Sequence, residues 1–264
     1  MSTAQSKANP AHHPPHPAGE PAAALRVVSV SRHYQSAGSG SVAALRDVSF
    51  ELATGAFLAI TGPSGCGKST LLNLIAALDT PDSGSLFVGG TDLAKTDEAT
   101  RTLHRRTGVG IVFQFFNLLP GLSVEENAAL PLRLQGVNRQ ERLDRARELL
   151  DFVGLGHRRQ HQSHQLSGGE MQRCAIARAL IHSPPLILAD EPTGNLDTAA
   201  ATAVLDVFER IRGEGRATLV LVTHSEETAA LAGERIRMQD GTILSHTRRS
   251  PSGSEAPAPP KIDG

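Results

Sequence analysis

The sequence has few of the features that mark secreted or membrane-spanning proteins. It contains no tryptophan, one tyrosine and two cysteines, Cys66 and Cys174, in 264 residues. Two cysteines do not make a disulfide framework, so we expect a protein of a reducing cytosol. No apolar run approaches the roughly 20 residues that cross a bilayer. The run at residues 71–78 is short and carries an asparagine, so it is better explained as a buried helix.

Neither sign of charge is in excess. The 26 Lys and Arg residues nearly balance the 27 Asp and Glu residues, for a formal net charge of −1. This balance argues against sequence-independent binding of nucleic acid, and we predict no nucleic-acid partner. Prolines and histidines interrupt every apolar stretch near the N-terminus, which therefore does not resemble a signal peptide. We expect the protein to stay in the compartment where it is made.

Composition predicts one folded domain between two tails. Residues 1–24 and 249–264 are rich in Ala and Pro with little that builds a core, and we expect both to be disordered. Residues 25–248 are long enough for one sizeable core. Apolar runs there predict strands over residues 25–30, 48–52, 57–61, 85–88, 109–113, 186–189 and 217–222. The sequence predicts helices over residues 68–78, 168–181 and 198–212. Residues 123–165 are predicted to be mostly helical, and apolar residues at helical spacing mark a helix at 139–153 within them.

This alternation of strands and helices predicts an α/β fold with a mainly parallel sheet covered on both faces. The early strands follow one another without helices, which favours a small antiparallel sheet beside the parallel one.

A glycine-rich loop follows the predicted strand at 57–61 and opens a helix, the context of a P-loop. Its glycines let main-chain N–H groups curl around a polyphosphate, and the helix N-terminus adds partial positive charge. Lys68 would then reach the β- and γ-phosphates, and the Ser69 hydroxyl would bind Mg²⁺. The residues predicted to bind nucleotide here are Gly62, Pro63, Ser64, Gly65, Cys66, Gly67, Lys68, Ser69 and Thr70.

Two acids, Asp190 and Glu191, end the apolar strand predicted at 186–189. Adjacent residues at a strand end point in different directions, so the two can have different roles. We predict that Asp190 holds Mg²⁺ and that Glu191 acts as general base for the attacking water. Solvated acids at a strand terminus are the alternative, which fits one acid better than a pair.

Residues 166–170 read Leu-Ser-Gly-Gly-Glu and precede a predicted helix. The serine hydroxyl and glycine amides would form a second anion cradle at a helix N-terminus. This motif, together with the P-loop, resembles the signature of ABC (ATP-binding cassette) ATPases. The resemblance covers roughly residues 25–246. It implies a P-loop NTPase core with an inserted helical subdomain at about 115–180, and ATP and Mg²⁺ as ligands. It also implies a homodimer in which Ser167, Gly168 and Gly169 of one copy face the γ-phosphate bound by the other.

The family pattern implies further site residues. Gln114 matches the Q-loop glutamine, which touches Mg²⁺ and water, and His224 matches the switch histidine that contacts the γ-phosphate. Asp197 lies in a match to the D-loop at the dimer interface. Tyr34 stands where the family has an aromatic residue that stacks on adenine, although its own neighbourhood is poorly patterned. Lys68, Gln114, Glu191 and His224 are thus the predicted catalytic residues, and Ser69, Gln114 and Asp190 the predicted metal ligands.

The segment 114–127 carries Phe115, Phe116, Leu118 and Leu119 where the chain leaves the catalytic core. Exposed, these residues would form a docking site; alternatively, they pack under the helical subdomain. Together with residues 71–80 and 194–197, this segment resembles the sequences of the family branch that serves lipoprotein release and macrolide export. That resemblance implies a separate integral-membrane permease, with the chain at the cytoplasmic face of the inner membrane.

Other functions remain open at this point. A non-transport ABC ATPase of DNA repair, chromosome organisation or translation usually has two cassettes, a coiled-coil insertion or a zinc module, which this sequence lacks. A cell-division ABC ATPase that signals through a membrane partner would show much the same motifs. A small-molecule kinase would share the P-loop but not the Leu-Ser-Gly-Gly-Glu motif.

Overall fold

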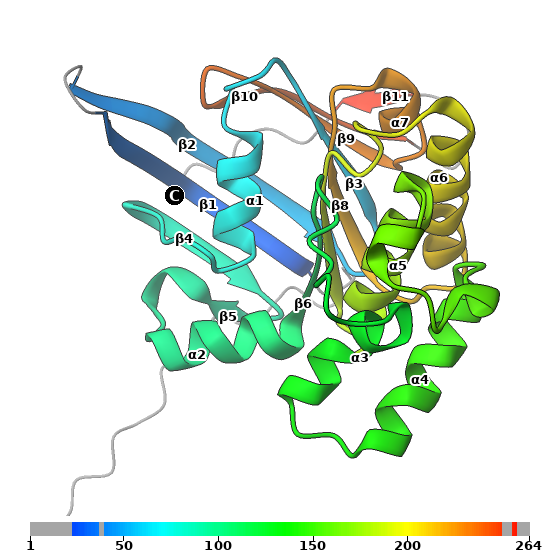
Figure 1. The fold of residues 1–264 in the computed structure, drawn as a ribbon. Coiled ribbons are helices and arrows are strands. Elements are labelled where there is room, and N and C mark those ends of the chain that lie inside the picture. The colour runs from blue at the N-terminus through cyan, green and yellow to red at the C-terminus, as the bar shows by residue number, and fades with distance from the viewer. Residues whose placement is uncertain (1–22, 37–39, 250–254, 258–264) are drawn as a thin grey trace, which may run out of the picture.

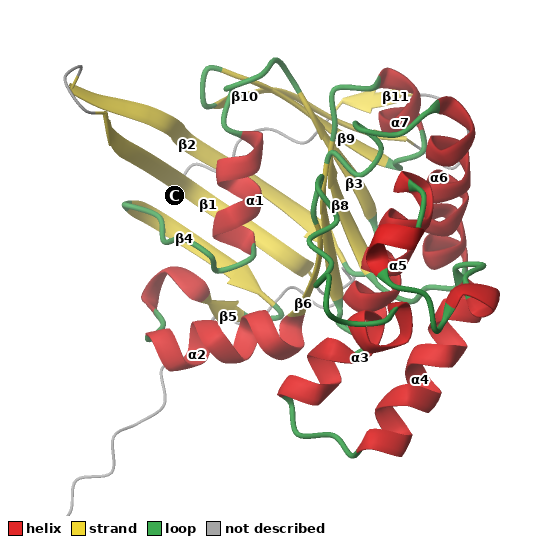
Figure 2. Ribbon diagram, viewed as in Figure 1, coloured by secondary structure: helices red, strands yellow, loops and turns green. Residues whose placement is uncertain are grey.

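The computed structural model of the protein describes residues 23–36, 40–249 and 255–257. Within these residues the strands form two sheets (Figure 2). The antiparallel sheet has the order β2-β1-β4-β5 and contains β1 (Ala23–Ser36), β2 (Gly40–Ala53), β4 (Ser83–Val88) and β5 (Thr91–Asp92). The other has the order β11-β10-β9-β3-β8-β7-β6 and contains β3 (Phe57–Thr61), β6 (Val109–Val112), β7 (Leu186–Asp190), β8 (Thr218–Val222), β9 (Glu234–Gln239), β10 (Thr242–Arg249) and β11 (Glu255–Pro257).

The centre of the second sheet is parallel, as predicted. Strands β9, β3, β8, β7 and β6 pair in parallel, and β10 and β11 add antiparallel pairs at one edge. Side chains alternate between its faces. Along β3, Leu58 and Ile60 enter the core shared with the antiparallel sheet, whereas Phe57 and Ala59 enter the core on the opposite face. The sheet is therefore buried on both faces, which explains why its central strands are so uniformly apolar.

The helices cover both faces of this sheet (Figure 1). They are α1 (Lys68–Ile75), α2 (Glu98–Leu103), α3 (Val124–Leu134), α4 (Arg139–Phe152), α5 (Gly168–Leu180), α6 (Thr198–Gly213) and α7 (Glu226–Ala230). Helix α1 lies between the two sheets, and α5 and α6 cover the opposite face. Helices α3 and α4 project from the core as a helical subdomain that packs against α5.

Several elements differ from the sequence-based expectation. Helix α1 ends at Ile75 rather than at residue 78, because Ala77 adopts a left-handed φ of 54°. Strands β1 and β2 extend well beyond the predicted ranges 25–30 and 48–52 and pair along most of their length. Strands β9 and β10 were not predicted. Arginines alternate with apolar residues in β9, and β10 has only two apolar residues before polar and charged ones, so neither has the continuous apolar run of the neighbouring buried strands.

The C-terminal segment also differs from the predicted tail. Arg249 is the last residue of β10, and residues 255–257 form β11, which pairs antiparallel with β10. Pairing along an exposed strand edge requires main-chain groups rather than an apolar side-chain pattern, which explains why composition did not reveal it. At the other end, residues 23 and 24 already belong to β1. The rest of both predicted tails, residues 1–22, 250–254 and 258–264, lies outside the described residues.

Candidate functional site

The loop at residues 62–67 joins the carboxyl end of β3 to the first turn of α1. Gly62 and Gly67 have φ values of 147° and 103°, which glycine adopts and other residues resist. A Cβ on Gly62 would overlap the main-chain oxygen of Met238, and one on Gly67 would overlap that of Ala44. Gly67 is also the N-cap of α1, so no cap side chain covers the first N–H groups of the helix. The loop therefore offers main-chain donors and a positive helix end to a phosphate.

The side chain of Lys68 lies over this loop and is only 8% exposed. Its Nζ donates hydrogen bonds to the carbonyl oxygens of Gly62, at 2.9 Å, and Pro63, at 3.0 Å. An ionised phosphate oxygen is a stronger acceptor than a neutral carbonyl. A phosphate that enters the loop can therefore attract the ammonium away from the main chain. Cys66 is buried beneath the loop, with its Sγ 4.0 Å from Nζ.

The predicted metal ligands Ser69 and Asp190 come together from different elements. The Ser69 hydroxyl, in the first turn of α1, donates to Asp190 Oδ1 at 3.4 Å, at the end of β7. Burial raises the pKa of Asp190, and the neighbouring Glu191 raises it further, while Lys68 opposes the change. A partly buried carboxylate beside a hydroxyl, with room for water and phosphate oxygens, is the all-oxygen donor set that suits Mg²⁺. The residues present thus fit the implied ion.

Glu191 and His224 form a direct contact that the sequence analysis did not foresee. The Glu191 Oε2 atom lies 2.9 Å from His224 Nδ1 and 3.4 Å from the His224 main-chain N–H. Glu191 itself has a left-handed φ of 45°, and its N–H donates to the carbonyl of Val222 at 2.9 Å. The carboxylate is thus oriented by two donors, with 16% of the glutamate side chain exposed. A carboxylate that is held in place but still reachable by water is suited to act as a general base.

Gln114 follows β6 and lies at the same edge of the sheet. Its main-chain oxygen accepts a hydrogen bond from Asn195 Nδ2 at 3.3 Å. A Cβ on Gly194 would lie 3.5 Å from Gln114 Nε2 and 3.6 Å from the Glu191 Cβ, so both side chains border this glycine. The structure thus brings the predicted Gln114 close to Glu191, the predicted general base, because the carboxyl ends of β6 and β7 are neighbours.

The second predicted cradle, Ser167–Gly169, begins α5. The Ser167 hydroxyl accepts from the Glu170 N–H at 3.3 Å, and the Glu170 carboxylate accepts from the Ser167 N–H at 2.9 Å, a capping box. Space for a side chain at either glycine is limited. A Cβ on Gly168 would lie 3.1 Å from Leu196, and one on Gly169 would lie 2.8 Å from Ala200. Among the described residues, no hydrogen bond joins this cradle to the loop at 62–67.

Asp197 lies next to this cradle in the structure, at the start of α6. Its carboxylate accepts a hydrogen bond from the Ala200 N–H at 2.9 Å and caps the helix. Such a cap fixes the first turn of α6 against the glycines of the cradle. Within one copy of the chain, this predicted nucleotide-binding residue therefore has a structural contact rather than one with the P-loop.

Tyr34 lies near the end of β1 with 38% of its surface exposed. Its hydroxyl donates to Asp79 Oδ2 at 2.7 Å and also interacts with the Thr70 side chain of the P-loop helix. Burial, followed by the bond to Asp79, raises the pKa of the phenol. The structure therefore places the predicted aromatic residue beside the P-loop.

The apolar segment after Gln114 is divided between surface and core. Phe115 is 71% exposed and Leu119 46% exposed, whereas Leu118 packs against the core. Phe116 and Asn117 form a left-handed turn, with φ values of 60° and 50°. Neither the docking nor the packing interpretation of the segment therefore holds for all four of its apolar residues.

Arg178, on α5, holds this turn and was not predicted. Its Nη1 donates to the carbonyl of Asn117 at 2.5 Å, and its Nη2 donates to that of Phe116 at 2.7 Å. Burial lowers the pKa of this arginine. The signal in the sequence that could have identified it was a charged residue between Ala177 and Ala179 on a predicted helix. Both alanines are buried in the structure.

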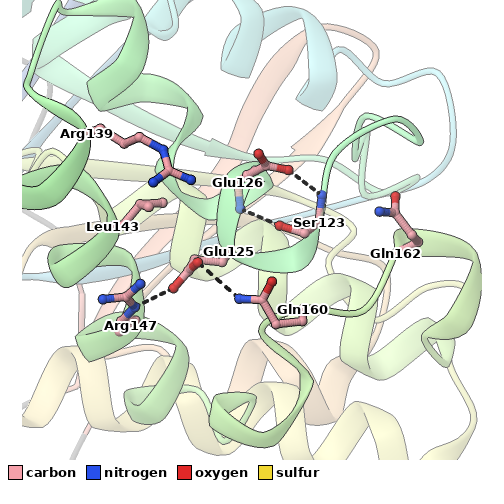
Figure 3. Close-up of a pocket in the computed structure, with 8 residues that line it drawn as sticks. All are labelled: Ser123, Glu125, Glu126, Arg139, Leu143, Arg147, Gln160 and Gln162. Carbon is pink, nitrogen blue, oxygen red and sulfur yellow. Dashed lines mark hydrogen bonds and ion pairs between the residues drawn. The ribbon is translucent and has the colours of Figure 1, made fainter.

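A polar pocket of about 330 Å³ lies in the helical subdomain (Figure 3). In it, Glu125 is 5% exposed and pairs with Arg147, whose Nε lies 2.6 Å from Glu125 Oε1. Ser123 and Glu126 form the capping box of α3 at its rim. The residues that line the pocket are Ser123, Glu125, Glu126, Arg139, Leu143, Arg147, Gln160 and Gln162. None of them was predicted as a site residue.

The described helices include none that is both long enough and apolar enough to cross a membrane. Residues 45–194 match the family model described as ABC transporter. The lipoprotein-releasing system ATP-binding protein LolD of Geobacter metallireducens is 44% identical over 220 residues, which are 83% of this chain and 97% of that protein.

Two further comparisons extend this match. The macrolide export ATP-binding/permease protein MacB of Rhodospirillum rubrum is 43% identical over 91% of this chain and 37% of its own length. A solved dimeric structure of the ATP-binding cassette MJ0796, in a post-hydrolysis state bound to ADP and Pi, superposes with a TM-score of 0.77 at 36% identity. That match covers 85% of this chain and 98% of the cassette. The P-loop at one sheet edge, the paired acids beside it and these similarities agree, and the chain belongs to the ABC transporter family, as an ATP-hydrolysing subunit of the branch that includes LolD and MacB.

Proposed function

We propose that two copies of this chain bind two ATP molecules between them, head to tail, and that their closure drives a separate membrane permease. The main support is the division of the site. The P-loop and the cradle Ser167–Gly169 are both suited to bind anions, yet within the described residues no hydrogen bond connects them. One copy needs only one such cradle for one triphosphate. A second copy would present its cradle to the γ-phosphate that the first copy holds.

Each residue of the site has a chemical role in this proposal. The main-chain donors at 62–67 and the Lys68 ammonium bind and orient the phosphates. Ser69, Asp190 and Gln114 would hold Mg²⁺, which supplies neutralising charge to the phosphates. Glu191 orients the attacking water and accepts its proton, and the contact with His224 keeps the carboxylate in place. General-base assistance of this kind is worth about 10²- to 10⁴-fold in rate.

Hydrolysis then opens the dimer. The γ-phosphate links the two copies only while it is attached to the nucleotide that the P-loop holds. Its release removes the charge that the Ser167–Gly169 cradle binds, so the closed form loses its advantage. The free energy of nucleotide binding becomes a shift between closed and open forms.

The membrane partner would bind around the exposed side of the Gln114 segment. Phe115 and Leu119 lie on this surface. Leu134, at the end of α3 in the helical subdomain, is 67% exposed. An apolar groove of about 390 Å³ runs between β6, α3 and α5, with Leu134 in its lining. Arg105, Arg106 and Arg178 also line it, so it suits an apolar segment that carries an acidic residue.

The relatives indicate the kind of transporter. LolD proteins of several bacteria match this chain over nearly their full length, and they are named for a lipoprotein-releasing system. We therefore propose a permease of the lipoprotein-release or macrolide-export type, with this chain bound to it at the cytoplasmic face of the inner membrane.

The head-to-tail arrangement can be tested by complementation between two inactive chains. One carries Lys68→Ala and the other Ser167→Arg, and differently tagged copies are purified as mixed dimers. In a head-to-tail dimer, one site receives both defects and the other receives none. The mixed dimer should therefore hydrolyse ATP although neither parent does.

The matched control places both substitutions on one chain and pairs it with the wild-type chain. Each site then carries one defect, and hydrolysis should be lost. If each chain works alone, the first mixed dimer should be inactive and the control should keep one working site. That reversed pattern, or equal activity of the two mixed dimers, would show that the proposal is wrong. The Glu191→Gln chain should in addition form an ATP-dependent dimer, measurable by light scattering, that hydrolyses ATP slowly.

A further inference from the structure

Asp79 collects the hydrogen bonds that hold Tyr34. Its Oδ2 accepts from the Tyr34 hydroxyl at 2.7 Å and from Arg32 Nε at 3.1 Å. Its Oδ1 accepts from Arg32 Nη2 at 2.8 Å and from the Thr80 N–H at 2.7 Å. The aspartate is thus bound to β1 through two side chains and is fixed to its own main chain. The Asp79 side chain is 24% exposed, so these hydrogen bonds are partly shielded from water and are stronger than they would be in open solvent.

Arg32 completes the arrangement from one side of the ring. Its guanidinium carbon lies 4.9 Å from the centroid of the Tyr34 ring, within the range of a cation–π contact. Its remaining nitrogen, Nη1, binds Asp82 Oδ1 at 2.6 Å. A guanidinium held by two carboxylates has little freedom to leave the ring. The Tyr34 ring therefore has one face covered, its hydroxyl anchored and part of its surface open.

The position of this ring relates it to the nucleotide. Its hydroxyl also interacts with Thr70, in the first turn of the helix that begins at the P-loop. Asp79 follows the same helix after the left-handed turn at Ala77. One short stretch of chain thus carries both the phosphate-binding loop and the anchor of the aromatic ring.

We propose that Asp79 is a positioning residue for the nucleobase: by anchoring the Tyr34 hydroxyl and the Arg32 guanidinium, it fixes the ring as a stacking surface with a single open face. This inference rests on the proposed binding of ATP at the P-loop and on the adenine-stacking role that the family resemblance implies for Tyr34. The part of the affinity that comes from the base then depends on Asp79, and the part that comes from the phosphates does not. Stacking accepts any base with a broad π-face, so the surface favours purine nucleotides without distinguishing adenine by its edge.

The test compares two ligands on the full-length chain by calorimetry. ATP has a base and inorganic tripolyphosphate has none, while both offer three phosphates to the P-loop. Tyr34→Ala should weaken ATP binding by about 5- to 100-fold, the range of base–aromatic stacking. Asp79→Asn and Tyr34→Phe should each weaken it by roughly 3- to 10-fold, because the ring remains but loses its anchor. None of the three should change tripolyphosphate binding more than about twofold.

Asp82→Asn is the matched control, because Asp82 binds the same arginine but not the tyrosine. Its ratio of ATP affinity to tripolyphosphate affinity should stay near that of the wild type. If Tyr34→Ala lowers the ratio and both Asp79→Asn and Tyr34→Phe leave it unchanged, the inference is wrong while the role of Tyr34 stands. If Tyr34→Ala also leaves it unchanged, the proposed role of Tyr34 is wrong as well. Equal weakening of both ligands by Asp79→Asn would show that Asp79 supports the P-loop rather than the base. Should Asp79→Asn fail to fold, Tyr34→Phe tests the same bond.

Discussion

Replacement of Arg178 by methionine would test how helix α5 is joined to the segment after Gln114. Arg178 makes two hydrogen bonds, of 2.5 Å to Asn117 and 2.7 Å to Phe116, and both come from a charged donor. Such bonds contribute about 1.5–3 kcal/mol each. The net loss is smaller than the sum of the two bonds, because methionine avoids the cost of placing a charge in a partly buried position. That cost is reflected in the pKa of Arg178, which burial lowers. We expect a net loss of about 2–4 kcal/mol in the free energy of unfolding.

Thermal unfolding followed by circular dichroism measures this loss. For a domain of this size, about 2–4 °C of Tm corresponds to each kcal/mol, so the variant should melt roughly 4–16 °C lower. Arg178→Lys should lose about half as much, because one ammonium cannot span two carbonyls as a guanidinium does. Arg212→Met is the control. Arg212 pairs with Glu209 on the surface of α6 at 2.6 Å, and its loss should cost less than about 0.5 kcal/mol.

Hydrogen exchange should locate the effect. Phe116 and Asn117 both hold left-handed conformations, which cost of order 1 kcal/mol each when nothing supports them. Without the guanidinium, this turn should relax, and the amides at residues 114–119 should exchange faster than those of α6. A variant that melts with the wild type, or that loses protection evenly over the whole chain, would refute the idea that Arg178 clamps this turn.

The site leads to three further predictions, two for substitutions and one for a chemical modification. Asp190→Asn should abolish Mg²⁺-dependent hydrolysis yet raise the Tm of the nucleotide-free chain. Burial raises the pKa of Asp190, so the ionised carboxylate destabilises the fold at pH values above the ordinary carboxyl pKa. This destabilisation is lost as the pH falls through the raised pKa and the carboxylate is protonated. The gain in Tm should therefore be larger at pH 8 than under acidic conditions. Gly67→Ala should weaken ATP binding by at least about tenfold, because its φ of 103° is strained for alanine and the new Cβ would overlap Ala44. Cys66 should react slowly with a maleimide, since it is 3% exposed, and more slowly still with ATP bound.

Each of these has a clear opposing result. An Asp190→Asn chain that melts lower than the wild type at pH 8 would contradict the unfavourable burial of this carboxylate. For the glycine, Gly121→Ala serves as the control, since nothing lies within 4 Å of its added Cβ. Equal ATP affinity in the two alanine variants would remove the argument from backbone conformation. A rate of maleimide reaction that ATP does not change would show that bound nucleotide leaves Cys66 as accessible as before.

Much of the site was predictable because its motifs are local. The strand Phe57–Thr61 was predicted to the residue, since four apolar residues and a threonine lead into a glycine-rich loop. The start of α5 was predicted from its serine cap and the helical pattern after it. The role of the Gly62–Thr70 loop as a phosphate cradle depends on backbone freedom and a helix end, both of which are written in a few adjacent residues. For the same reason, Asp190 and Glu191 could be predicted as a pair with two different roles.

The amino-acid sequence by itself therefore indicated which segments are suited to bind phosphate and in what order they occur along the chain. Only the tertiary structure decided which of them meet. Glu191 contacts His224 because β7 and β8 are neighbours, Arg178 reaches the turn after Gln114 because α5 packs against β6, and Asp79 anchors Tyr34 because β1 passes the end of α1. Strand β9, with its alternating charges, belongs to the parallel sheet only through its pairing with β3. Such contacts join residues tens of positions apart, and they follow from the order of strands and the packing of helices, which no local pattern of residues encodes.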